Sequence, residues 1–154
     1  MKSSIICLWF DGNAEAAVTF YSQIFKDAKI HNKFYSEIAA PRQGRDTPLT
    51  IMFEIGGIQY MALNGGPQYN FSPAISIMIN CDTQEEIDYY WEALSKGGQT
   101  MACGWLTDKF GISWQITPSD FGKWIQSKEP GKAERVMKAM MQMVKLDLLT
   151  LQNA

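Results

Sequence analysis

The same order of predicted elements, one strand, one helix and then three strands, occurs twice along the chain and constrains the fold more than any other feature. In the first half, apolar periodicity and turn residues predict a strand over residues 4–10, a helix over 14–25 and strands over 29–35, 49–55 and 58–63. Asn13 is expected to cap the helix, and Gly56-Gly57 predict a two-residue hairpin because both turn positions need positive φ. Residues 41–48, rich in Gly, Arg and Asp, are predicted to form a loop.

The second half starts the same order again with a predicted strand over residues 74–80. Thr83 and Glu86 have the spacing of a capping box, which predicts that a helix begins there. Strand-like segments follow over residues 100–106 and 112–117. A duplicated βαβββ unit, and therefore an α+β fold of two such modules, explains this order better than two unrelated halves.

The tail after the second predicted module has a different, helical pattern. A short helix is predicted over residues 121–126 and a longer one over 132–144. The longer helix carries an apolar stripe made of Val136, Met137, Met140, Met141 and Val144. Methionine adapts well to irregular surfaces, so the stripe fits the sheet of its own chain and that of a second copy equally well.

Composition limits the class of protein. A length of 154 residues, of which 46% are hydrophobic, predicts one compact domain. The net charge of -2 and the pI of about 5.4 argue against nucleic acid as a partner. Three widely spaced cysteines predict a reducing compartment, and no stretch approaches the ~20 apolar residues of a membrane span. We therefore expect a cytoplasmic protein without a membrane partner.

Five segments of the chain resemble the PhnB-like family of the vicinal oxygen chelate superfamily, which contains glyoxalases and bleomycin-resistance proteins. The segments are CLWFDGNAEAAVTFYSQIF from Cys7, YMALNGGP from Tyr60, INCDTQEEIDYYWEAL from Ile79, CGWLTDKFGISWQI from Cys103 and AERVMKAMMQM from Ala133. The resemblance implies one glyoxalase-like domain with module one over about 1–70, module two over about 71–118 and a C-terminal helical extension over 119–154. It further implies that the two sheets form a cupped mixed sheet and that the protein is a homodimer.

Metal-dependent relatives hold one divalent cation in the cup with His, Glu or Gln from two strands of each module. The resemblance carries these positions onto Cys7 or its neighbour Ile6, Ala62, Ser76 and Gln115. Only Gln115 has a suitable donor, since a hard divalent ion requires several oxygen or imidazole ligands. The sequence therefore predicts that the protein has no metal ion and no other cofactor.

A concave, mostly apolar site with a few polar groups is typical of small-molecule binding. Strand alternation and the motif around residue 105 give a candidate ligand pocket, which consists of Cys7, Trp9, Tyr60, Asn64, Ser76, Trp105, Asp108 and Gln115. Five of them have a structural alternative: Trp9 and Trp105 as core residues, Cys7 as a small buried hydrophobe, Gln115 as an internal hydrogen-bonding group, and Asn64 as a turn former. His31 is expected at the surface.

The resemblance and the candidate pocket favour a protein that binds a small organic molecule in a metal-free cup. The alternative is a metal-dependent lyase, isomerase or dioxygenase, which would need a Lewis acid. A methyltransferase rests only on the family's label, 3-demethylubiquinone-9 3-methyltransferase. No catalytic residue is assigned from the sequence.

Overall fold

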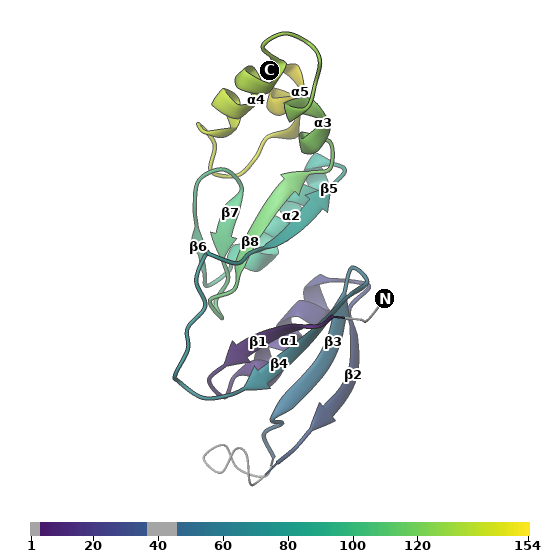
Figure 1. Cartoon of the computed structure of the whole chain (residues 1–154), viewed down its shortest axis with the longest axis vertical. Helices are drawn as coiled ribbons and strands as arrows, with labels where there is room; N and C mark the ends of the chain where they lie inside the picture. Colours follow the sequence, from purple (N-terminus) through teal and green to yellow (C-terminus); the bar gives the residue numbers. More distant parts are fainter. Residues whose placement is uncertain (1–3, 37–45) are drawn as a thin grey trace. The chain divides into compact units, whose positions relative to one another are not determined.

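The computed structural model describes residues 4–36 and 46–154 and divides the chain into two compact units, Met1–Phe71 and Ser72–Ala154 (Figure 1). Each unit contains a four-stranded mixed sheet with a helix on one face. Of the loop predicted over 41–48, residues 41–45 lie outside the described part of the chain. The described helices include none that is long and apolar enough to cross a bilayer.

The first unit has the predicted strand and helix order. Its elements are β1 (Ile6–Phe10), α1 (Ala14–Ile24), β2 (Lys29–Phe34), β3 (Thr50–Ile55) and β4 (Ile58–Asn64). The strand order in the sheet is β1-β4-β3-β2, in which β1 and β4 are parallel and the other pairs are antiparallel. Gly56 and Gly57 form the β3–β4 hairpin with φ of +59° and +75°, so the hairpin prediction is confirmed.

One face of this sheet and one face of α1 form the core of the first unit. The buried strand residues alternate along β1, β3 and β4, as half-buried strands require. The Tyr21 ring of α1 stacks on Phe53 of β3 at 6.4 Å between centroids, and Phe53 stacks on Tyr60 of β4 at 5.2 Å. No helix covers the opposite sheet face among the described residues of this unit, and this face is called the open face below.

The predicted cap of α1 is wrong. Asn13 precedes the helix but its side chain makes no capping hydrogen bond. Asn64, 50 residues away, accepts a hydrogen bond from the Ala14 backbone N–H at 3.0 Å and donates to the Pro48 carbonyl at 2.8 Å. A residue at the end of β4 therefore accepts a hydrogen bond from a free backbone N–H group at the N-terminus of α1. The sequence does not show this contact, because the two residues are far apart in the chain.

The second unit repeats the arrangement with a shorter sheet. Its elements are β5 (Ile77–Cys81), α2 (Gln84–Ser95), β6 (Gln99–Thr100), β7 (Trp105–Thr107) and β8 (Ser113–Pro118), with strand order β5-β8-β7-β6. The predicted capping residue is confirmed, because Thr83 Oγ1 accepts from the Glu86 backbone N–H at 3.2 Å. The Glu86 carboxylate reaches back to the Asp82 backbone N–H rather than to that of Thr83.

The single strand predicted over residues 100–106 is wrong, since β6 and β7 are separated by residues 101–104. Cys103 and Gly104 have φ of +61° and +78°, which no strand allows. Their backbone N–H groups bind the carbonyls of Met143 and Val144, both at 2.8 Å. These two N–H groups therefore bond to the C-terminal tail instead of to a neighbouring strand, and the strand is interrupted.

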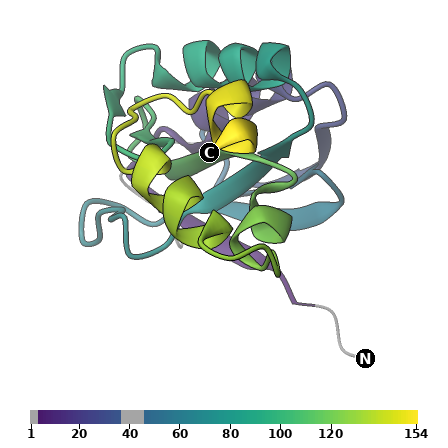
Figure 2. The same cartoon turned by 90° about the horizontal axis from the view of Figure 1, so that it is seen from above.

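The tail forms three helices, α3 (Phe121–Ile125), α4 (Lys132–Met140) and α5 (Leu148–Asn153), which Figure 2 shows gathered around the C-terminus. Their small core consists of Val136, Leu146 and Leu151. The helix predicted over 132–144 ends four residues early, and α5 was not predicted. The apolar stripe divides: Val136 and Met140 pack into this core, whereas Met137, Met141 and Val144 remain exposed.

Candidate functional site on the open sheet faces

The open face of the first sheet presents sulfur-containing and aromatic side chains. The strand register aligns Cys7 of β1 with Met61 of β4, and Met61 with Met52 of β3. Paired residues point to the same side of a sheet, so these three form one row. Cys7 is exposed, which contradicts the prediction of a small buried hydrophobe. Desolvation raises the pKa of its thiol, so it is not an activated nucleophile.

The register corrects one of the four positions carried over from metal-dependent relatives. Ala62 pairs with Leu8, and both are buried on the side of the sheet that faces α1. The β4 residue beside Cys7 on the open face is Met61, whose thioether is a soft ligand. The position carried over from these relatives therefore lies one residue earlier in β4, and Met61 adds no donor for a hard cation.

Trp9 lies in the next row of the same face and is held by the loop after β4. Its indole Nε1 donates to the Gly66 carbonyl at 2.8 Å, and the Tyr69 ring meets it edge-on at 5.0 Å between centroids. A Cβ on Gly65 would lie 2.3 Å from the indole, so only glycine permits this close approach. The glycines after Asn64 therefore serve the packing of Trp9.

Two other candidate residues of the first unit face α1 instead. Tyr60 and Asn64 share a side of β4, as strand alternation predicts, but that side is the core. Burial raises the pKa of the Tyr60 hydroxyl. The hydrogen bonds of Asn64 to Ala14 and Pro48 account for its burial.

The open face of the second sheet carries a mixed polar and aromatic row. Gln115 of β8 pairs with Met78 of β5 on one side and with Trp105 of β7 on the other. The Gln115 Nε2 donates to Ser76 Oγ at 2.8 Å. Three of the predicted pocket residues, Ser76, Trp105 and Gln115, therefore lie together on one face, and we call them with Met78 the Gln115 row.

Asp108 lies inside the second unit, where it organises the turn before β8. It is only 3% exposed. Its Oδ1 accepts from the backbone N–H groups of Phe110 and Ile112 at 2.8 and 3.1 Å, and its Oδ2 accepts from Trp114 Nε1 at 2.8 Å. These bonds explain why a carboxylate occupies a buried position.

Sequence reasoning missed Glu54, Met52 and Met61 on the open face of the first sheet. The alternation of β3 contained the signal, because Thr50, Met52 and Glu54 lie opposite its buried residues. The Glu54 carboxylate lies 3.6 Å from both Lys29 Nζ and His31 Nε2. His31 is exposed, as expected.

The donor set of these faces does not fit a divalent metal ion. Among the described residues, no group of three His, Cys, Asp or Glu side chains is placed to hold one. The positions carried over from metal-dependent relatives provide a thiol, a thioether, a hydroxyl and one amide, counting Met61 in place of Ala62. Hard cations instead require several converging oxygen or imidazole ligands.

The family model described as 3-demethylubiquinone-9 3-methyltransferase matches residues 2–117. The chain belongs to this family. It is the PhnB-like family of the vicinal oxygen chelate superfamily, so the resemblance stated from the sequence and the α+β fold of two modules are confirmed. The description is the name of the family and shows no activity for this chain.

Solved structures agree with this assignment. A putative 3-demethylubiquinone-9 3-methyltransferase, PhnB protein, from Bacillus cereus has 29% identity and a TM-score of 0.69, and the match covers 76% of this chain and 99% of that one. The fosfomycin resistance protein FosX from Mesorhizobium loti has 16% identity and a TM-score of 0.57, with coverage of 82% and 98%. A FosX from Listeria monocytogenes complexed with Mn(II) and sulfate ion has 21% identity and a TM-score of 0.50, with coverage of 75% and 89%. No curated protein matches the chain significantly.

Proposed function

We propose that this protein binds a small organic molecule on an open sheet face without a metal ion. The observation that carries the proposal is the Gln115 row, in which an amide, a hydroxyl, a thioether and an indole lie side by side. Pockets for small molecules combine apolar and aromatic surface with a few polar groups that fix orientation. The row has this composition.

The hydrogen bond between Gln115 and Ser76 prepares the amide for a ligand. It holds the Gln115 side chain in one orientation through one N–H group. The amide has a second N–H group and a carbonyl oxygen, which remain for a ligand that both donates and accepts. Trp105 beside it offers a ring for stacking, so a flat, weakly polar molecule suits the row.

Metal independence follows from the donor set. The metal-dependent alternative requires a Lewis acid that binds substrate oxygen. Only Gln115 among the four positions has the ligand type of the metal-dependent relatives, and one amide oxygen does not supply the several ligands that a hard cation requires. Purified protein is therefore expected to contain far less than one divalent ion per chain. Elemental analysis that finds one ion per chain, lost in Gln115→Ala, would contradict the proposal.

A thermal-shift screen with flat heterocycles, in the presence of a chelator, tests binding directly. A ligand at 100 times its dissociation constant stabilises the folded state by about 2.7 kcal/mol, which is readily measured as a shift in Tm. Gln115→Leu should remove the shift, while Gln142→Leu, an exposed glutamine of the tail, should retain it. Shifts that appear only with Mn²⁺, or that survive Gln115→Leu, would refute this assignment.

We further propose that the protein is a homodimer. Association would cover the exposed Met137, Met141 and Val144 of the tail. It would also cover the outer edge of β2, the last strand of the first sheet among the described residues. Light scattering at micromolar concentration is expected to give twice the chain mass. A monomeric mass would contradict this expectation.

A further inference from the structure

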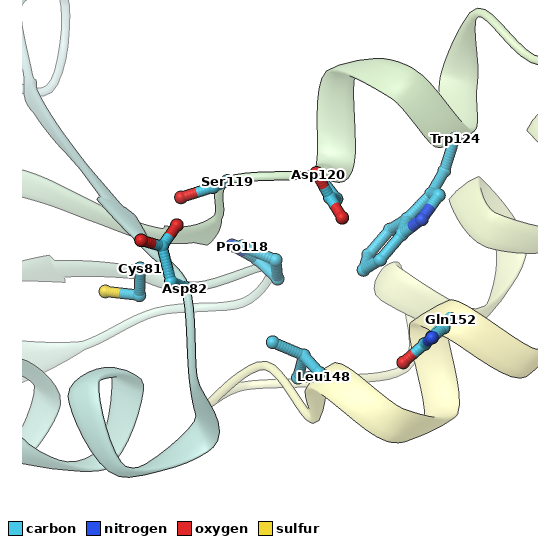
Figure 3. Close-up of a pocket in the computed structure, with 8 residues that line it drawn as sticks. All are labelled: Cys81, Asp82, Pro118, Ser119, Asp120, Trp124, Leu148 and Gln152. Atoms are coloured by element: carbon cyan, nitrogen blue, oxygen red, sulfur yellow. The ribbon is translucent and has the colours of Figure 1, made fainter.

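The second unit contains a pocket of about 260 Å³ away from its open sheet face, at the ends of β5 and β8 (Figure 3). Cys81 and Asp82 line it from the end of β5, and Pro118 lines it from the end of β8. Trp124 of α3 and Gln152 of α5 complete the wall, so the C-terminal helices form the other side.

The C-terminal extension builds most of this pocket. Six of the eight lining residues follow residue 117, where the match to the family model ends. The extension is a folded structure with its own small core of Val136, Leu146 and Leu151, against which Trp124 packs. The pocket is therefore built mostly from residues beyond the part of the chain that the family model matches.

The charge of the pocket is negative. Asp82 and Asp120 line it, and the lining contains no Lys, Arg or His. Asp120 pairs with Lys123, which is 80% exposed at its side chain, at 2.5 Å. The Asp82 carboxylate makes no hydrogen bond or ion pair with any part of the chain that the structure describes. Asp82 therefore has no direct partner among the described residues, and Lys123 acts on it only through longer-range Coulombic attraction.

Aromatic and apolar groups face the same space. Figure 3 shows the Trp124 ring and the Asp120 side chain turned toward the hollow that Leu148 and Gln152 border from the other side. An indole face attracts cations more strongly than other aromatic rings do. Leu148 and Pro118 offer surface for methylene groups, and Ser119 and Gln152 have oxygen atoms that accept from N–H donors.

We propose that this pocket binds a small organic cation, with a primary ammonium or guanidinium group on a short carbon chain. The two carboxylates and the indole supply opposite charge, and the apolar wall distinguishes an organic cation from a bare ion. A divalent metal is a poorer occupant, because Ca²⁺ takes 6–8 oxygen ligands and the lining has two carboxylates. This site is separate from the Gln115 row and does not depend on the proposed function.

Fluorine NMR of the full chain labelled with 5-fluorotryptophan tests the proposal, because the chain has five tryptophans and each gives its own signal. The variant Trp124→Phe identifies the Trp124 resonance. Titration with putrescine is expected to shift that resonance alone, with a saturable curve that weakens as salt is added. Butane-1,4-diol, which has the same chain length without charge, is expected to give no shift.

Asp82→Asn and Asp120→Asn should each raise the dissociation constant for putrescine by about two- to fivefold, which is the effect of losing one exposed charge interaction. Glu92→Gln removes the same charge from an exposed position of α2 and should leave the titration unchanged. Retained dispersion of the other four tryptophan signals shows that each variant is folded. The proposal is overturned if putrescine gives no saturable shift, if Mg²⁺ gives the same shift, or if Glu92→Gln weakens binding as much as the pocket variants do.

Discussion

Asp108→Asn tests whether this carboxylate is a structural acceptor rather than a ligand-binding group. In the variant one oxygen can still accept from the Phe110 and Ile112 N–H groups, but an NH₂ group would face the Trp114 indole N–H, 2.8 Å from the present Oδ2. A buried hydrogen bond to a charged group contributes about 1.5–3 kcal/mol, and the two remaining bonds weaken as the charge is lost. We expect a loss of about 3 kcal/mol in the free energy of unfolding.

A double-mutant cycle with Trp114→Phe isolates the interaction. Phenylalanine has no N–H group, so in this background Asp108→Asn no longer costs the indole bond, and the weaker backbone bonds account for a loss of about 1 kcal/mol. The cycle subtracts the cavity that the smaller ring leaves at this 1% exposed position. The expected coupling is therefore about 2 kcal/mol, measured by urea unfolding with the m value as a check. A coupling below about 0.5 kcal/mol would refute the reasoning, because independent sites add to within that margin.

Three further predictions concern a buried amide, a tightly packed glycine and the relative reactivity of two cysteines. Asn64→Ala should lower the free energy of unfolding by roughly 2–4 kcal/mol by urea titration, since it leaves a buried N–H and a buried carbonyl without partners; a loss below 1 kcal/mol would contradict this role. Gly104→Ala should destabilise the second unit, because the new Cβ would lie 2.7 Å from the Ile116 carbonyl oxygen at a φ of +78°; an unchanged Tm would count against the tail contact. Iodoacetamide at pH 8 should alkylate the exposed Cys7 well before Cys81, whose burial raises its pKa to about 12 and keeps its thiol protonated; peptide mass spectrometry showing equal rates would disprove this order.

The sequence by itself determined those structural features that depend only on residues close together in the chain. The Gly56-Gly57 turn fixed the β3–β4 hairpin through its positive φ angles, and Thr83 fixed the start of α2 through its side-chain oxygen. The alternation of apolar residues along β4 determined which residues share a face. These features depend on backbone geometry and neighbouring side chains, so they can be predicted without knowing the fold.

The tertiary structure alone decided which face became the core and which groups satisfied each other. Alternation placed Tyr60, Ala62 and Asn64 together, but only the packing of α1 assigned them to the buried side. In the same way, Asn64 rather than Asn13 caps α1, because the end of β4 lies beside the helix N-terminus. The contacts of Ser76 with Gln115 and of Asp108 with Trp114 likewise arise where separate segments meet.

The C-terminal tail shows most clearly the difference between what the sequence predicts and what the tertiary structure decides. Its helical periodicity was visible in the sequence, whereas the break between β6 and β7 came from hydrogen bonds that Cys103 and Gly104 make to residues 40 positions later. Local propensity fixes only what one segment prefers by itself. The partner of each buried polar group is chosen by the fold, because such a group must find its hydrogen bond wherever the packed chain supplies one.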